Sequence, residues 1–128
     1  MNRKEKKMKQ GIFTVVENKA LTPTTWRMKL EGDSSAVELP GQFIDIKLDG
    51  KFLRRPISVC DVDYTDRYGR EGIVTIIYKV LGSGTEDMTG LEKGRELDVL
   101  TGLGNGYDLE GSGDRPLLIG GGVGIPPL

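Results

Sequence analysis

The placement of glycine constrains the fold of this chain more than any other feature of its sequence. Nineteen of the 128 residues are glycine, and they stand between short apolar segments rather than inside them. Because glycine adopts turn conformations that other residues avoid, this spacing is typical of an all-β domain with many turns. The length allows one domain with a hydrophobic core of its own.

The apolar segments alternate with polar residues at the period of a β-strand. Segments 25–30 and 42–48 show the alternation clearly. Their inward-facing residues are predicted to be Trp26, Met28, Leu30, Ile44, Ile46 and Leu48. Further strands are predicted over 12–16, 52–59, 73–80 and 96–100. Six short antiparallel strands are best closed into a Greek-key barrel, because closure removes exposed strand edges.

The connections between these strands carry predictions of their own. Asp49-Gly50 fits a tight turn that needs a positive φ. Pro56 is poorly tolerated in a central strand, so its strand is predicted to lie at an edge or to bend there. Residues 61–72 are predicted to form a mobile polar loop, and residues 82–94 a connection that contains one helical turn.

Several kinds of chemistry are excluded by composition. The chain has no histidine, which removes the Ser-His-Asp triad and the commonest metal ligand. No catalytic side chain and no metal ligand is therefore predicted, and any chemistry points to a bound cofactor. The single cysteine, Cys60, excludes an internal disulfide and fits the reducing cytoplasm. A net charge of −1 and the lack of an apolar run of about 20 residues argue against nucleic-acid and membrane partners.

Two arginines are the first candidate binding residues. Arg54 and Arg55 are adjacent on a predicted strand, so their side chains point to opposite faces. One of them can then lie along a groove, where its planar guanidinium could make paired hydrogen bonds to a pyrophosphate. The alternative is a surface strand with solvated arginines.

A second candidate is the glycine-rich stretch 82–90. Thr85 is predicted to be the N-cap of a helical turn, and Gly84 lets backbone N–H groups approach an anion closely. Glu86 and Asp87 would repel a phosphate unless they point away. The alternative is a capped turn in a loop that binds nothing.

The last residues look like the opening of a second domain. An apolar run at 117–119 leads into a glycine-rich turn that contains Gly122 and Gly124, a pattern that normally opens a pyrophosphate-binding helix. The predicted organisation is a flexible basic N-terminus over 1–10, a barrel over 11–113 and the start of a nucleotide-binding domain over 114–128.

The order and spacing of these motifs resemble the ferredoxin–NADP reductase superfamily. In that family a Greek-key barrel binds a flavin, and a second domain binds a nicotinamide nucleotide. The family's flavin motif, Arg-x-Tyr-Ser/Thr, is matched at 55–58, except that Ile57 replaces the aromatic residue. This replacement, the doubled arginine and the stretches 59–61 and 102–106 are similar to one branch, the electron-transfer subunits of class 1B dihydroorotate dehydrogenases.

The resemblance implies that FAD is the cofactor. Arg55 would pair with its pyrophosphate, and Ser58 would hydrogen-bond the isoalloxazine ring near N5. Pro56 and Ile57 would shape the wall against which the ring lies.

The remaining contacts implied by the family lie later in the chain. Ile77, Tyr78 and Lys79 would line the adenosine and ribityl side of FAD. Gly84 and Thr85 would contact the pyrophosphate through backbone and hydroxyl groups, so they are predicted to meet Arg55 on the outside of the barrel.

In the branch, NADH passes a hydride to FAD, and electrons then go singly through a two-iron, two-sulfur cluster to FMN in the dihydroorotate dehydrogenase catalytic subunit. Gly122 and Gly124 would belong to the NAD-binding domain. The cluster needs four cysteine thiolates and the chain has only Cys60, so FAD binding without completed NADH oxidation is expected of this truncated chain. The alternatives are the flavin domain of another NAD(P)H–ferredoxin or hydrogenase reductase subunit, and a cofactor-free interaction module.

Overall fold

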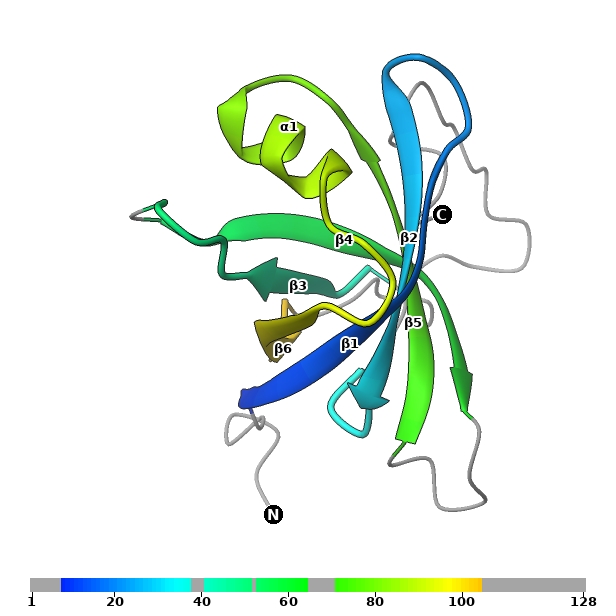
Figure 1. Ribbon diagram of the computed structural model, residues 1–128. Helices are drawn as coiled ribbons and strands as arrows, with labels where there is room; N and C mark the ends of the chain where they lie inside the picture. Colours follow the sequence, from blue (N-terminus) through cyan, green and yellow to red (C-terminus); the bar gives the residue numbers. More distant parts are fainter. Residues whose placement is uncertain (1–7, 38–40, 52, 65–70, 105–128) are drawn as a thin grey trace, which may run out of the picture.

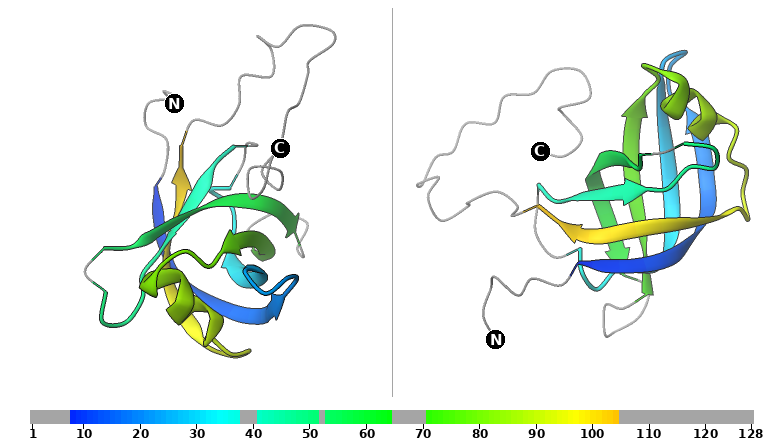
Figure 2. Two further views of the ribbon diagram at one scale, coloured as in Figure 1. Left: turned by 90° about the horizontal axis from the view of Figure 1, so that it is seen from above. Right: turned by 90° about the vertical axis from the view of Figure 1, so that its left-hand side faces the viewer.

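The computed structural model describes residues 8–37, 41–51, 53–64 and 71–104. In this part of the chain the strands curve around a common interior, and one short helix lies across an end of the barrel (Figures 1 and 2). The elements are β1 (Lys9–Ala20), β2 (Thr25–Asp33), β3 (Phe43–Ile46), β4 (Arg55–Tyr64), β5 (Glu71–Lys79), α1 (Ser83–Thr89) and β6 (Glu96–Leu103).

The strands close in the order β1-β2-β5-β4-β3-β6, and every neighbouring pair is antiparallel. The predicted fold class, an all-β six-stranded antiparallel barrel, is confirmed. The run β3-β4-β5 stands between β2 and β6, so the chain returns across the barrel in the Greek-key manner. The helix α1 is too short and too polar to span a bilayer, and no other helix occurs in the described ranges.

The interior is filled by the apolar faces of the strands. Alternation sends successive side chains to opposite faces, and five of the six predicted inward residues are buried. Trp26, the sixth, is partly buried and packs against the core. The core is completed by Phe13, Val15, Val37, Val59, Val74, Ile76, Tyr78, Met88, Leu97 and Val99.

Several strand boundaries differ from the predicted ones, and three of the differences fall in segments that were predicted to be flexible or a loop. β1 begins at Lys9, inside the segment predicted to be flexible. β4 continues to Tyr64 and β5 begins at Glu71, so both ends of the predicted loop over 61–72 are strand. Polar residues form strand here because they occupy the outer face while the backbone of the neighbouring strand supplies their hydrogen bonds. The rest of that loop and the predicted domain over 114–128 lie outside the described residues.

The turn predicted at Asp49-Gly50 is present. Gly50 has a φ of +74°, and the N–H of Lys51 donates to the carbonyl of Leu48 at 3.2 Å, which closes the turn. The turn belongs to a longer connection than the predicted tight hairpin, because β3 ends at Ile46. Lys51 therefore stands at the end of a turn that a backbone hydrogen bond holds in place.

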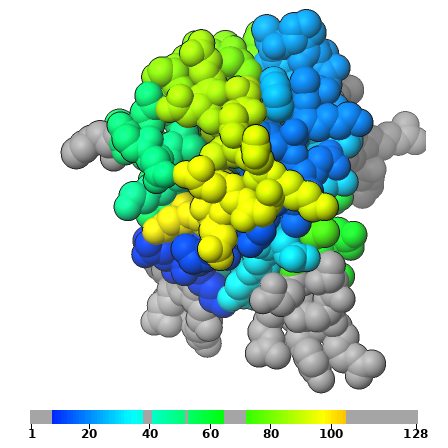
Figure 3. All heavy atoms as spheres, viewed as in Figure 1, coloured from blue at the N-terminus to red at the C-terminus, as the bar shows by residue number. Residues whose placement is uncertain are grey.

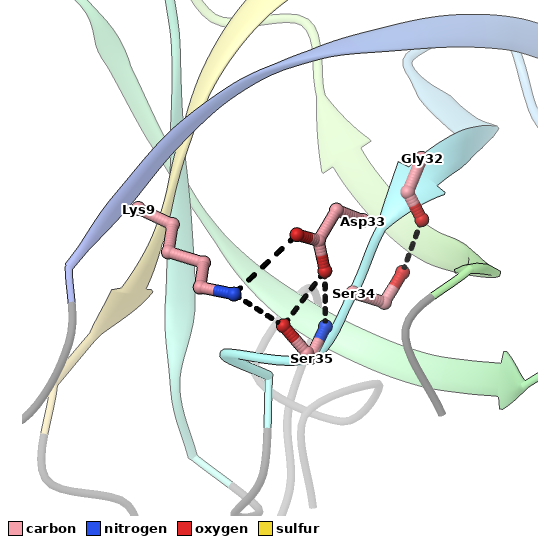
Figure 4. A network of polar contacts seen from close by, with 5 residues as sticks. All are labelled: Lys9, Gly32, Asp33, Ser34 and Ser35. Atoms are coloured by element: carbon pink, nitrogen blue, oxygen red, sulfur yellow. Dashed lines mark hydrogen bonds and ion pairs between the residues drawn. The ribbon is translucent and has the colours of Figure 1, made fainter. Parts of the chain in front are cut away.

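A polar network ties the start of β1 to the end of β2 (Figure 4). The Oδ1 atom of Asp33 accepts hydrogen bonds from the amide of Ser35 at 3.0 Å and from its hydroxyl at 2.7 Å. Nζ of Lys9 donates to the same hydroxyl at 2.7 Å and lies 3.4 Å from Oδ2 of Asp33. Ser34, which is fully buried, donates to the carbonyl of Gly32 at 3.1 Å.

We expect this network to make the folded chain sensitive to acid. The hydrogen bond from the Ser35 hydroxyl, helped by its amide and by Lys9, holds the pKa of Asp33 below its ordinary value. A carboxyl with a lowered folded pKa gives stability above its unfolded pKa of about 3.9, and this stability is lost as the pH falls through the folded pKa. In urea unfolding between about pH 6 and about pH 2, Asp33→Asn should flatten the acid limb of the stability curve. Asp63→Asn, at an exposed site on β4, is the matched control, and an unchanged limb in Asp33→Asn would contradict the assignment.

Candidate ligand-binding site between β4 and β5

Strands β4 and β5 pair along only part of their length. Their register ends at Val59 and Ile76. Beyond that point, residues 55–58 pair only with β3 and residues 77–79 pair only with β2. Each segment therefore has one edge without a strand partner in the described part of the chain. The two strands diverge toward the end of the barrel where α1 lies between them (Figure 1).

Pro56 lies on this open edge of β4. Proline has no backbone N–H, and on this open edge no neighbouring strand needs that donor. Pro56 therefore costs the barrel no hydrogen bond. The prediction of an edge strand is wrong for β4 as a whole, which stands between β3 and β5, but an open edge does exist at Pro56 itself. Asp45 is opposite Pro56 in the register, and its Oδ1 atom is buried without a hydrogen-bond partner. Such an orphaned acceptor is uncommon in a folded protein.

The two adjacent arginines have separate surroundings. Arg54 donates to the backbone carbonyl and to Oδ1 of Asp98, both at 3.1 Å. A hydrogen bond from Gln10 to the Asp98 carboxylate holds the pKa of Asp98 below its ordinary value, and the bond from Arg54 adds to this effect. Arg55 is half-buried and has no hydrogen bond or ion pair with any described residue. A partly desolvated guanidinium without an acceptor is costly, so Arg55 is well placed to receive an anion.

Gly84 of α1 packs directly against the guanidinium of Arg55. A Cβ at position 84 would lie 2.7 Å from both Cζ and Nη2 of Arg55 and would collide with its Nε. Gly84 is buried, and glycine is required there for this close approach. The structure thus brings together the two places that were predicted to meet; what they bind stays a prediction.

The start of α1 differs from the predicted one. The N-cap is Gly82, and Thr85 is the third helical residue, so the prediction of Thr85 as N-cap is wrong. The Thr85 hydroxyl accepts from the N–H of Leu81 at 2.9 Å and of Gly82 at 3.1 Å, and it donates to the carbonyl of Gly82. It is therefore occupied within the turn. The first helical bond runs from Glu86 to Gly82, which leaves the N–H groups of residues 83–85 without an intrahelical acceptor.

Tyr78 has a structural role that sequence reasoning missed. Its side chain is 2% exposed and points into the core, so it cannot line an outer surface as predicted; only its backbone can. Its hydroxyl donates to Oδ1 of Asn18 at 2.9 Å, and burial raises the pKa of Tyr78 to about 12. Nδ2 of Asn18 donates in turn to the carbonyls of Met88 and Leu91, at 2.7 and 3.0 Å. This chain of bonds anchors the C-terminal end of α1 to the barrel.

The other predicted contact residues divide between two environments. Pro56, Ser58 and Lys79 are exposed. Ile57 and Ile77 are half-buried, and Ile57 packs against the core. Gly122 and Gly124 lie outside the described residues.

A metal centre is not built by the residues that the structure describes. They contain no group of three or more acidic, cysteine or histidine side chains that could hold an ion. Cys60 is half-buried, and desolvation together with the charge of Asp61 raises the pKa of its thiol. A raised pKa lowers the fraction of the reactive thiolate form at neutral pH.

This arrangement offers groups that can hold an anion. The Arg55 guanidinium and the free amides at 83–85 supply charge and hydrogen-bond donors for phosphate oxygens. The divergent edges of β4 and β5 add backbone donors and acceptors along a gap. These groups are suited to binding an anion.

Two solved structures share this barrel fold. A NADH-dependent reduced ferredoxin-NADP oxidoreductase, described for flavin-based electron bifurcation, matches with a TM-score of 0.64 and 26% identity, over 77% of this chain and 34% of that one. The Amycolatopsis cytochrome P450 reductase GcoB matches in fold with a TM-score of 0.73 and 21% identity, over 94% of this chain and 37% of that one. The class that the structure defines is therefore a six-stranded barrel of the ferredoxin reductase type.

Proteins with similar sequences point to one group of proteins within this fold class. No family model matches the chain. The electron transfer subunits of dihydroorotate dehydrogenase B (NAD(+)) from Fusobacterium nucleatum and Enterococcus faecalis are 42% and 38% identical to it, each over 94% of this chain. Over nearly all of its length the chain is therefore similar to this family of electron transfer subunits. It spans 47% and 46% of the length of these two relatives.

Proposed function

We propose that the barrel binds FAD in the gap between β4 and β5 and serves as the flavin-carrying part of a cytoplasmic electron-transfer subunit. One observation carries the proposal: the half-buried, unpartnered guanidinium of Arg55 lies against Gly84 at the mouth of two open strand edges. A diphosphate fits the charge of this place, and the strand edges beside it offer backbone donors and acceptors to the rest of a dinucleotide.

Different residues of the chain would bind different parts of FAD. Arg55 and the amides at 83–85 bind the diphosphate, which supplies the acceptor that Arg55 lacks. Ser58, exposed on β4, donates to the ring near N5, and Pro56 and Ile57 form the wall beneath it. Ile77 and Lys79 flank the adenosine and ribityl side. FAD, when bound, supplies the exchange of a hydride for single electrons, which no side chain here can perform.

The activity of the whole protein is the wider part of the proposal. We place this barrel in a protein that takes electrons from NADH and passes them, through an iron–sulfur cluster, to the catalytic subunit of a dihydroorotate dehydrogenase in pyrimidine biosynthesis. The names of the relatives support this assignment. Among the described residues Cys60 is the one thiol, whereas such a cluster is held by four cysteine thiolates.

The direct test is an absorption spectrum of the purified, folded chain before and after FAD is added and excess is removed. Retention of the oxidised flavin bands supports the proposal. Equilibrium dialysis that shows no uptake of FAD by folded protein would overturn it and favour a cofactor-free interaction module. Retained flavin in a chain that fails to couple to a dihydroorotate dehydrogenase would favour another NAD(P)H-dependent reductase subunit.

Replacing Arg55 with alanine should weaken FAD binding. Loss of a charged hydrogen bond to the diphosphate should cost about 1.5–3 kcal/mol, or roughly ten- to a hundredfold in Kd. Isothermal titration of the folded apoprotein with FAD measures the change. Arg54→Ala removes the same charge from the adjacent position, where the partner is Asp98, and should leave FAD affinity near that of the parent chain. Equal losses in the two variants would show that only net charge matters.

A further inference from the structure

We propose that Lys51 is a positioning residue for this site: it holds the first turn of α1 so that Gly84 stays against Arg55. The inference rests on the proposed function, because it concerns the diphosphate end of the same gap. Lys51 belongs to no motif, and only its contacts distinguish it from the other lysines of the chain.

Lys51 links the β3–β4 connection to α1. Its Nζ donates to Oγ of Ser83 at 3.1 Å and lies 3.3 Å from Oδ2 of Asp87. These two residues are separated by one helical turn, so the ammonium group spans the turn that carries Gly84. The Lys51 side chain is 26% exposed and that of Asp87 is 51% exposed, so water screens this pair in part.

The connection that carries Lys51 is itself fixed to the barrel. The turn closed by Leu48 and Lys51 sets the direction of the chain. Next to it, Oδ2 of Asp49 lies 2.6 Å from Nη2 of Arg95, just before β6. These two contacts hold the connection that carries Lys51 against the barrel, so that Lys51 can position the helix.

The helix is thus held from two sides. It lies between the β3–β4 connection and the β1–β2 end of the barrel (Figure 3). Asn18 of β1 holds its C-terminal end, and Lys51 holds its first turn. An isolated helix of seven residues does not keep its shape in water, so the place of that turn depends on such contacts. Arg55 has no described partner of its own that would fix the separation.

The test compares three variants of the folded chain. Lys51→Met should weaken FAD binding about fivefold and speed hydrogen exchange at the amides of 84–87 in the apoprotein. Lys51→Arg keeps the charge and reach and should restore the affinity to within about twofold. Lys47→Met is the matched control, because Lys47 is exposed on the same connection and should keep the parent affinity.

The outcomes separate the two proposals. If the parent chain binds FAD and Lys51→Met binds it equally well, the positioning role is overturned and the proposed function stands. Unchanged exchange in α1 of Lys51→Met would also overturn it, because the tether would then hold nothing. If the parent chain takes up no FAD, the proposed function fails and the positioning role fails with it.

Discussion

Alanine at position 84 should weaken FAD binding at least tenfold while leaving the fold as stable as that of the parent chain. The new methyl group would occupy the space of the Arg55 guanidinium and force that side chain away from the diphosphate. Alanine is also the better helix former by about 1 kcal/mol, which offsets the cost of moving a flexible side chain. Isothermal titration with FAD and urea unfolding of the same sample separate the two effects.

The matched control for this substitution is Gly82→Ala. A Cβ at position 82 meets nothing within 4 Å, so FAD affinity should change little. Combining Gly84→Ala with Arg55→Ala provides a second check. If the methyl group acts by displacing the guanidinium, it should have little further effect once Arg55 is gone. Full additivity of the two losses would show that Gly84 and Arg55 contribute independently, contrary to the packing described above.

Replacing Asn18 with alanine should lower the free energy of unfolding by about 2–4 kcal/mol. The change removes the acceptor of the buried Tyr78 hydroxyl and the donor shared by two carbonyls at the end of α1. Each buried polar group left without a partner costs about 1–3 kcal/mol. Urea unfolding followed by far-ultraviolet circular dichroism gives the difference.

Tyr78→Phe is the companion variant, because it removes one hydroxyl and leaves Asn18 bonded to the helix. It should cost less than Asn18→Ala, and the double variant should lose less than the sum of the two, since both share one hydrogen bond. A loss below about 0.5 kcal/mol for Asn18→Ala, the range of an ordinary surface substitution, would show that the network does not hold α1.

The barrel could be predicted from sequence because its signal is local. Ile44 and Ile46 alternate with polar neighbours, and a period of two leaves only one way to bury an apolar face. The proximity of Arg55 and Gly84 was predicted in a different way, through the order of motifs in a family. No property of either segment alone shows that the end of β4 comes to lie beside α1.

The anchors of α1 could not be predicted. Asn18 and Lys51 act through bonds to residues far away in the sequence, and such contacts leave no periodic pattern. The N-cap prediction at Thr85 was wrong for a related reason. Threonine favours the N-cap, but here its hydroxyl accepts hydrogen bonds from the amides of residues 81 and 82. The strand ending at Tyr64 was missed because β5, rather than the local composition, makes that segment extended.

The early end of the β4–β5 register has a consequence for the handling of the protein. A row of backbone groups with no strand beside it is a template on which a segment of another chain can add. In the described part of the chain, the place that suits a cofactor is therefore also a place where a second chain can pair with the barrel. We expect occupancy of the gap to decide how well the chain stays dispersed at high concentration.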